Sequence, residues 1–194
     1  PASILDIGTG TGLLALILAQ QCNAPVDAVE QDKSATGEAM DNFMASPWAG
    51  RMKIYHTRMQ DYQPAKQYDL IICNPPFYEN SLVSEDEKRS QAMHEQTLRW
   101  DELFSWINAN LGGGGYAALL VPFGRSVNAI MELRHIGLYL SAQCNIRQTM
   151  GHDFFRSVLI VSKQKTETVK TEEIAIRESE TEYSEAFRKL LKAY

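Results

Sequence analysis

One stretch near the start of the chain decides the fold: Ile4-Leu5-Asp6-Ile7-Gly8-Thr9-Gly10-Thr11-Gly12. Residues 4–7 predict a buried strand, and the glycines after them predict a sharp turn into a helix over 12–21. Glycine suits this turn because it has no Cβ, so the backbone can bend tightly and a ligand can approach it closely. The spacing of the helix predicts an apolar side made of Leu13, Leu14, Ile17 and Leu18.

The rest of the chain alternates short β-rich runs with helical stretches, which is typical of a parallel sheet covered on both faces. We predict further strands at 26–30, 52–56, 68–73, 116–121, 138–147 and 157–162. We predict helices at 34–45, 100–111 (ended by the glycines at 112–115) and 126–136, a polar loop at 78–96, and a polar tail from 163 with a closing helix after 183. The last two strands form a hairpin. The sequence therefore predicts an α/β fold with a mostly parallel seven-stranded sheet, helices on both faces and an antiparallel C-terminal hairpin.

Length and composition favour one domain over 1–194. Pro1-Ala2-Ser3 leads straight into the first strand with no preceding helix, so we expect that a segment before it is missing from this chain. Cys22, Cys73 and Cys144 form no C-x-x-C pair, which argues against disulfides and a zinc site and favours the cytoplasm. The longest aliphatic run has seven residues, whereas a membrane span needs about 20. We therefore predict neither a metal nor a membrane as partner and make no prediction of oligomeric state.

The glycine spacing separates two kinds of cofactor loop. A dinucleotide loop has the pattern G-x-G-x-x-G, which would place a glycine where this chain has Leu13. The observed pattern, Asp6-x-Gly8-x-Gly10-x-Gly12, resembles that of class I methyltransferases, which have a Rossmann-like fold. This resemblance implies that the loop holds the amino-acid end of S-adenosyl-L-methionine. The alternative is a glycine-rich turn without a ligand.

Three acids downstream are candidates for binding the rest of the cofactor. Glu30 ends the second strand, about 20 residues after the loop, where a carboxylate can accept hydrogen bonds from both ribose hydroxyls. Asp32 is the competing candidate, and either acid could instead be a solvated residue at the start of a helix. Asp61 follows the third strand and is placed to accept from the adenine amino group, although acids in loops are often only solvated.

A second motif, Asn74-Pro75-Pro76-Phe77, follows the strand at 68–73. Parallel sheets bind ligands at the carboxyl ends of their strands, so we expect Asn74 to face both the glycine loop and the cofactor. The Asn74 side-chain oxygen and the Pro75 carbonyl can accept the two hydrogens of an exocyclic amine, while Pro76 stiffens the backbone and Phe77 can stack on a base. The tetrad therefore predicts methylation of a base amino group by positioning, without a metal or a strong base. The alternative is a rigid turn.

Further motifs narrow the resemblance to one family. The chain is similar to the bacterial tRNA1(Val) adenine-37 N6-methyltransferases at Val29-Glu30-Gln31-Asp32, Asn42-Phe43, Ser46-Pro47-Trp48, 73–78, 89–94 and 183–194. This resemblance implies that Asn74, Pro75, Phe77 and Tyr78 meet a substrate adenine in tRNA. Two departures are the absent segment before the glycine loop and Met93, where the family tends to carry arginine.

Contact with RNA has to come from a local patch, because the net charge is −5. Arginines are concentrated from Arg125 to Arg156, and we predict that Arg147 and Arg156 bind the substrate if these residues share one basic face; each could instead be a solvated charge. Trp100 is interpreted as a packing residue. Two other functions stay open: a guanine-N2 or release-factor glutamine methyltransferase would use the same tetrad, and a module that binds cofactor and RNA without methyl transfer would keep the glycine loop.

Overall fold

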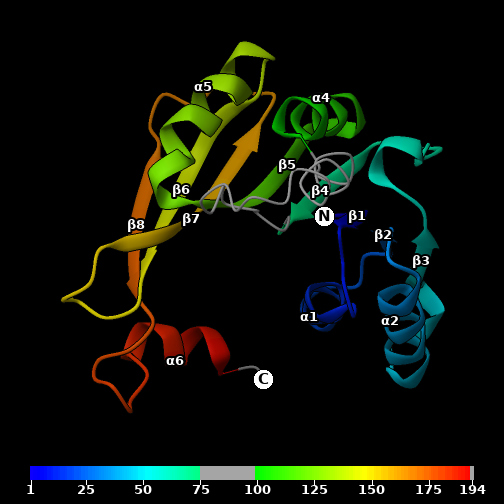
Figure 1. Ribbon diagram of the computed structural model, residues 1–194. Coiled ribbons are helices and arrows are strands. Elements are labelled where there is room, and N and C mark those ends of the chain that lie inside the picture. The colour runs from blue at the N-terminus through cyan, green and yellow to red at the C-terminus, as the bar shows by residue number, and fades with distance from the viewer. Residues whose placement is uncertain (75–98, 193–194) are drawn as a thin grey trace, which may run out of the picture.

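The computed structural model describes residues 1–74 and 99–192 (Figure 1). The strands in these ranges are β1 (Ile4–Ile7), β2 (Val26–Glu30), β3 (Met52–His56), β4 (Tyr68–Cys73), β5 (Leu111–Pro122), β6 (Tyr139–Arg147), β7 (Phe154–Ser162) and β8 (Lys170–Ala175). The helices are α1 (Leu13–Gln21), α2 (Lys33–Ala45), α4 (Trp100–Asn110), α5 (Ser126–His135) and α6 (Glu185–Leu191). Short 3-10 turns are η1 (Ala49–Arg51), η2 (Met59–Asp61) and η3 (Phe123–Arg125).

These strands form one sheet in the order β3-β2-β1-β4-β5-β7-β6-β8. Strands β1 to β5 pair in parallel, and β7 pairs antiparallel with both β5 and β6. The predicted fold class is confirmed, with one strand more than expected. This eighth strand, β8, pairs in parallel with β6 at the edge of the sheet, where the sequence predicts a polar tail. Its first four residues are polar and exposed on both faces, so no apolar alternation marks it as a strand.

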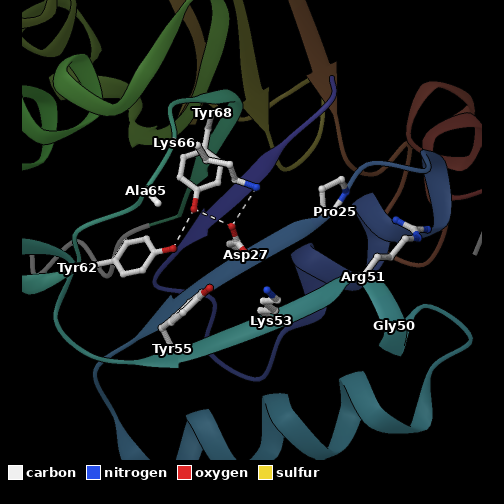
Figure 2. A pocket seen from close by; sticks show the side chains of 10 residues that line it. All are labelled: Pro25, Asp27, Gly50, Arg51, Lys53, Tyr55, Tyr62, Ala65, Lys66 and Tyr68. Carbon is white, nitrogen blue, oxygen red and sulfur yellow. Dashed lines mark hydrogen bonds and ion pairs between the residues drawn. The ribbon is translucent and has the colours of Figure 1, made fainter.

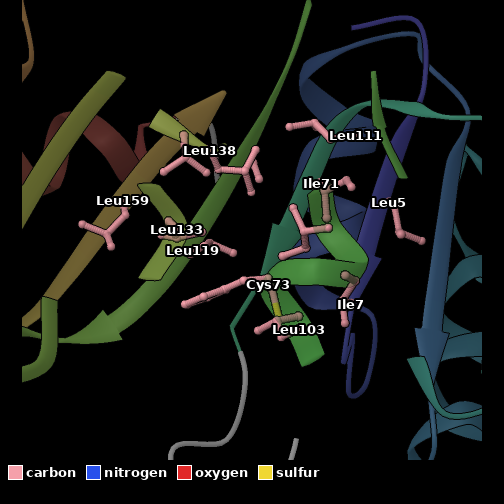
Figure 3. Packing of buried hydrophobic residues seen from close by; sticks show 14 of the residues in the cluster. Leu5, Ile7, Ile71, Cys73, Leu103, Leu111, Leu119, Leu133, Leu138 and Leu159 are labelled. Atoms are coloured by element: carbon pink, nitrogen blue, oxygen red, sulfur yellow. The ribbon is translucent and has the colours of Figure 1, made fainter. Parts of the chain in front are cut away.

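Two hydrophobic clusters lie on opposite faces of the sheet. Ile4 belongs to one and Leu5 to the other, because successive side chains of a strand point to opposite faces. The larger cluster packs the sheet against α4 and α5, for example Leu119 against the layer of Leu103 and Leu133 (Figure 3). The smaller cluster packs β1 and β2 against α1 and α2, with Phe43 at its centre. Figure 1 shows these two helical layers on either side of the sheet.

Helix α1 buries a different face from the one predicted. Its buried residues are Ala15 and Ala19, whereas Leu13 is 63% exposed and Leu14 is 38% exposed. The prediction that these two leucines lie on the buried side is wrong. Small side chains let the helix axis approach the strands closely, and the bulkier leucines at its first turn then point outward, near the end of the sheet.

The glycines at 112–115 lie inside β5 and not in a turn before it. Strand β4 pairs Tyr68 with Leu111 and then Leu70 with Tyr116, so four residues of β5 lie opposite the single residue Asp69 and form a bulge. A Cβ on Gly115 would lie 2.9 Å from the Tyr68 carbonyl oxygen. Glycine is therefore required by this close backbone approach, which the sequence alone does not distinguish from a helix stop.

The strand order reverses between β1 and β4, and this places the site. The last residue of β1, Ile7, pairs with Val29 on one side and with Cys73 on the other. The next residues on three adjacent strands are therefore Gly8, Glu30 and Asn74, all at the carboxyl edge of the sheet. Ligands of open α/β sheets bind at such a reversal point.

Candidate functional site

The glycine loop rests on the end of β2. The backbone amides of Gly8 and Thr9 donate to the Val29 carbonyl at 2.9 and 3.2 Å. The next amide, that of Gly10, donates to Glu30 Oε2 at 2.9 Å. The loop and the acid at the end of β2 are thus one hydrogen-bonded unit, which brings together two features that the sequence predicts separately.

The conformation of the loop explains its glycines. Gly10 and Gly12 have φ values of 58° and 87°, in the left-handed region that glycine adopts readily. A Cβ on Gly12 would lie 2.5 Å from the Phe43 ring, whereas a Cβ on Gly10 would meet open space. The backbone at Gly10 is therefore free for a ligand to approach. Asn42 supports the loop by donating from Nδ2 to the Thr11 carbonyl at 2.9 Å.

Asp6 lies buried beneath this loop, only 1% exposed. The Thr9 hydroxyl donates to its Oδ2 at 2.6 Å, but Oδ1 is buried without a hydrogen-bond partner among the described residues. Burial raises the pKa of Asp6 to about 6; the Thr9 hydroxyl and the Ala15 backbone amide oppose this rise, and the charge of Glu30 adds to it. A buried carboxylate oxygen without a donor fits a cationic amino group, such as that of S-adenosylmethionine.

The two candidate acids for the ribose, Glu30 and Asp32, already make different hydrogen bonds. Asp32 is the N-cap of α2, and its Oδ1 accepts from the Ala35 amide at 2.8 Å. Glu30 Oε1 accepts from the Asp32 amide at 2.9 Å, and its Oε2 accepts from Gly10. Carboxylate oxygens can each accept a second hydrogen bond, so Glu30 can also bind a diol placed over the loop.

Asp61 ends the turn η2 and projects into solvent. Its side chain is 66% exposed, with the Arg58 guanidinium at 4.0 Å, a surface ion pair of small energy. Its neighbours hold the segment in place: Met59 is buried in the larger core cluster, and the Tyr62 ring stacks 6.2 Å from Trp106. Asp61 is therefore an exposed acid on an anchored turn, next to the carboxyl edge of β3.

A chain of three side chains ties this turn to the sheet (Figure 2). Tyr62 Oη lies 2.9 Å from Tyr68 Oη, and Tyr68 donates to Asp27 Oδ2 at 2.8 Å. A carboxylate only accepts hydrogen bonds, so the Tyr68 hydroxyl donates its hydrogen bond to Asp27 and the Tyr62 hydroxyl donates to Tyr68. Lys66 Nζ, 3.5 Å from the same Asp27 oxygen, offsets the buried charge. Burial raises the pKa of Tyr62 to about 12 and raises the pKa of Tyr68 as well, so both phenols stay protonated at neutral pH.

These side chains line a cavity of about 450 Å³ against β2 and β3. Asp27, Tyr62, Tyr68 and Lys66 satisfy one another there (Figure 2). We therefore interpret these hydrogen-bonded side chains as a structural support that holds the Asp61 turn against the sheet, and not as a ligand site.

Replacing Tyr62 by phenylalanine should remove one hydrogen bond of this chain while keeping the ring. We expect the free energy of unfolding to fall by about 1 kcal/mol, and the affinity for S-adenosylmethionine to fall several-fold as the Asp61 turn loosens. Chemical denaturation and calorimetry measure the two effects, with Tyr116→Phe as the control because Tyr116 is half exposed on β5. A loss of stability with unchanged cofactor affinity would show that the chain does not position Asp61.

Asn74 follows β4 directly and is exposed. Cys73 before it is buried and pairs with Ile7, which places Asn74 beside the start of the glycine loop, as the sequence predicts. Burial raises the pKa of the Cys73 thiol, so this cysteine is not a nucleophile at neutral pH. The other predicted substrate residues, Pro75, Pro76, Phe77 and Tyr78, lie outside the described residues, as does 89–94 with Met93.

One of the arginines from 125 to 156, Arg134, lies apart from the other three. Arg134 lies in the last turn of α5, which leads into the start of β6 at the opposite edge of the sheet. Arg147 is 18% exposed and already bonds Glu173 Oε2 at 3.1 Å. Arg156 lies on β7 opposite Ile146 and reaches only its neighbour's carbonyl, that of Phe155, at 3.1 Å. Of the two predicted substrate-binding arginines, Arg156 is the more available.

Known proteins resemble this chain in sequence over nearly its whole length. A family model described as the methyltransferase small domain matches residues 1–98. The tRNA1(Val) (adenine(37)-N6)-methyltransferase of Cytophaga hutchinsonii is 38% identical over 99% of this chain and 82% of the relative. Those of Christiangramia forsetii (35% identical; 100% and 82% covered) and Shewanella amazonensis (34%; 99% and 83%) are similar. The chain belongs to this family.

Solved methyltransferase structures share the fold of this tRNA1(Val) (adenine(37)-N6)-methyltransferase family member. A predicted O-methyltransferase from Agrobacterium tumefaciens superposes with a TM-score of 0.75 at 15% identity, covering 99% of this chain and 89% of the other. The glycopeptide N-methyltransferase MtfA complexed with S-adenosylmethionine gives 0.63 at 12% identity, covering 84% and 88%. At these identities the likeness concerns the fold alone.

Sequence reasoning missed the residues that support the site. Thr9 lies between two loop glycines and donates a hydrogen bond to Asp6, and its spacing of three residues from the acid is the signal that could have found it.

Within 1–74 and 99–192, no group of three or more acidic, cysteine or histidine side chains could hold a metal ion. Among the helices of the same ranges, none combines the length and the apolar composition needed to cross a membrane.

Proposed function

We propose that this chain transfers a methyl group from S-adenosylmethionine to the N6 amino group of an adenine in tRNA, in the cytoplasm. One observation supports this most directly: Asn74 lies beside a glycine loop whose buried acid, Asp6, has an unpartnered oxygen. Membership in the tRNA1(Val) (adenine(37)-N6)-methyltransferase family supports the choice of adenine and of tRNA.

We assign a different part of the cofactor to each residue of the site. Asp6 Oδ1 would accept from the amino group at the amino-acid end, Gly10 lets that end approach the backbone, and Glu30 would accept from the ribose hydroxyls. Asp61 would accept from the adenine amino group. S-adenosylmethionine, when bound there, supplies a methyl group already activated on a sulfonium, so neither a metal nor a strong base is needed.

The chain's own contribution to catalysis is to position the amine. The Asn74 side-chain oxygen and the Pro75 carbonyl would accept its two hydrogens, which favours a pyramidal nitrogen whose lone pair is less delocalised into the ring and points towards the methyl group. As the N–C bond forms and the S–C bond breaks, positive charge grows on the nitrogen, and both acceptors then bind it more strongly. One amine proton leaves to water after transfer. Phe77 offers a face on which the base can stack.

Parallel methylation assays distinguish this function from its alternatives. Labelled S-adenosylmethionine is offered to unmodified tRNA, ribosomal RNA and a protein extract, and the products are digested and identified by mass spectrometry. We expect N6-methyladenosine in tRNA. Label as N2-methylguanosine or in a protein glutamine would reject the substrate but keep the reaction class, and cofactor binding without any labelled product would reject the enzyme.

The two neighbouring acids give a matched pair of variants for the cofactor site. Glu30→Gln should weaken S-adenosylmethionine binding by about 1–3 kcal/mol, because charged hydrogen bonds to the ribose are lost. Asp32→Asn keeps an N-cap and should leave the affinity unchanged within about two-fold. Isothermal calorimetry measures both. Equal losses in the two variants would mean that Glu30 has no particular role with the ribose.

A further inference from the structure

Four arginines in the described ranges lie over aromatic rings, and all four are at one edge of the sheet. The guanidinium-to-ring distances are 4.4 Å for Arg125 over Trp100, 4.8 Å for Arg147 over Phe154, 5.7 Å for Arg156 over Phe155 and 5.1 Å for Arg177 over Tyr183. The two lysines over rings, Lys66 on Tyr68 and Lys165 on Tyr139, lie at the opposite edge.

Strand register defines the arginine edge. Cys73, the last residue of β4, pairs with Leu119, which pairs with Leu159 on β7. Arg156 is three residues from Leu159 towards the carboxyl edge, where it pairs with Pro122, just before η3 and Arg125. This edge is therefore the one that carries Asn74.

The other two arginines continue the same edge outward. Arg147 ends β6 and pairs with Ala175, the last residue of β8, and Arg177 follows two residues later. Arg125 follows β5, Arg156 lies on β7, Arg147 ends β6 and Arg177 follows β8, and these strands lie in that order from the strand of Asn74. With neighbouring strands about 4.8 Å apart, the row is on the order of 15 Å long.

The lysine pairs lie at the other end of the strands. Tyr68 begins β4, and Tyr139 begins β6, where it pairs with Ser162 at the end of β7. Lys165 follows that end by three residues. The separation of arginine from lysine pairs between the two edges matches the position of the site, since only the arginine edge adjoins Asn74.

The two arginines nearest the site are also the more available. Arg125 is exposed, and the Phe155 ring under Arg156 is 41% exposed. Farther out, Arg147 bonds Glu173 at 3.1 Å, and Arg177 donates to the Glu180 carbonyl at 2.7 Å. The exposed acids along the edge are Asp153, Asp101 (paired with Arg99), Glu173 and, beside Arg177, Glu178, Glu180 and Glu182, so the outer half of the row is largely neutralised.

A stacked arginine can recognise single-stranded RNA in two ways. The ring holds the guanidinium plane fixed, which leaves its N–H groups free to bond a phosphate and its outer face free to stack on a base. RNA loops are recognised by such combinations of charge and flat faces. A local row of this kind also explains how a chain with a net charge of −5 could bind a polyanion.

We propose that this arginine–aromatic row binds the tRNA nucleotides that flank the target adenine, with Arg125–Trp100 and Arg156–Phe155 making the principal contacts. The inference rests on the proposed function and deepens it, because it assigns the surface that receives the RNA on one side of the reactive base. It also revises the interpretation of Trp100 as a packing residue alone: the ring contacts the core and carries Arg125 as well.

The test compares two double variants that remove the same charge. Arg125→Gln with Arg156→Gln should raise the Kd for unmodified tRNA at least ten-fold near 0.15 M salt, and should lower the slope of log Kd against log salt by about two. The control, Lys163→Gln with Lys165→Gln, removes two charges at the opposite edge and should leave that slope unchanged. Cofactor affinity should stay within about two-fold in both double variants, because neither pair of residues lies in the cofactor site. Equal tRNA affinity and slope in the two double variants would overturn the proposal.

Arg156→Lys provides a second test that does not depend on charge. It keeps the positive charge but loses the planar stack, so tRNA affinity should fall several-fold with little change in salt slope. Unchanged tRNA affinity in Arg156→Lys would mean that only the positive charge at this position matters, and would reject the proposed stacking of the guanidinium on RNA. If the unmodified protein labels only a protein substrate, the proposed function itself fails; if it methylates tRNA but the edge variants bind normally, only this surface fails.

Discussion

Replacing Asn74 by alanine is expected to lower kcat for tRNA methylation by about 10²- to 10³-fold, the range found when one preorganised hydrogen-bond partner of a transition state is removed. The acceptor contributes little before transfer, because the ground-state amine is neutral, and more as charge grows on its nitrogen. The KM for tRNA should therefore change by less than about three-fold. Rapid-quench single-turnover assays with labelled cofactor measure the chemical step separately from product release.

Two companion variants sharpen the expectation. Asn74→Asp keeps an acceptor at the same position and should retain more activity than the alanine variant. Asn128→Ala removes an exposed asparagine on α5 and should be indistinguishable from the unmodified protein. The affinity for S-adenosylmethionine should change much less than kcat in Asn74→Ala. If KM rises while kcat stays unchanged, Asn74 binds the base equally in the ground state and the transition state and does not contribute to catalysis.

The parts of the site that could be predicted from sequence are those with local signals. The turn from Asp6 to Gly12 needs glycines at fixed positions, and the strand at 68–73 places Asn74 once the strand order is inferred. The sequence favours Glu30 over Asp32 for the ribose because Glu30 ends a strand, and the structure adds that Asp32 already caps α2 by accepting from the Ala35 amide. The family resemblance singled out Asn42-Phe43 without giving a reason; the structure shows that both residues support the glycine loop.

The parts that could not be predicted depend on long-range pairing. Strand β8 carries polar residues on both faces because it lies at an exposed edge, so its sequence is that of a tail. Arg147 and Arg177 are adjacent only because β6 and β8 pair. Arg134 does not belong to the arginine row, because α5 runs back to the opposite edge of the sheet. A count of arginines along the chain shows neither fact.

Asp6→Asn is expected to make the cofactor-free protein more stable at pH 8 while weakening cofactor binding. The pKa of Asp6 is raised from 3.8 to about 6, so the folded protein keeps this proton over a pH range in which the unfolded chain has lost it. The contribution of Asp6 to stability is thus greatest below about pH 4 and is lost as pH rises through about 6. Two pKa units correspond to about 3 kcal/mol, which is the largest gain expected for the asparagine variant at pH 8. Urea unfolding at pH 4, 6 and 8 measures it, and the gain should vanish at pH 4.

The same substitution, which stabilises the cofactor-free protein, should weaken the binding of the cofactor. An ionised Asp6 Oδ1 gains a cationic donor from the amino-acid end of S-adenosylmethionine, so the affinity of the unmodified protein should rise as pH increases from 5 to 7. Asp6→Asn should remove this pH dependence and weaken binding by about 10- to 100-fold at pH 8, as expected for a lost charged hydrogen bond. Methylthioadenosine lacks the amino group and should bind both proteins alike at every pH. If binding of methylthioadenosine still depends on pH, the titrating group is not Asp6. If that binding does not depend on pH, Asp6 is the titrating acid: its burial destabilises the cofactor-free protein, and its charge favours binding of the cofactor's amino group.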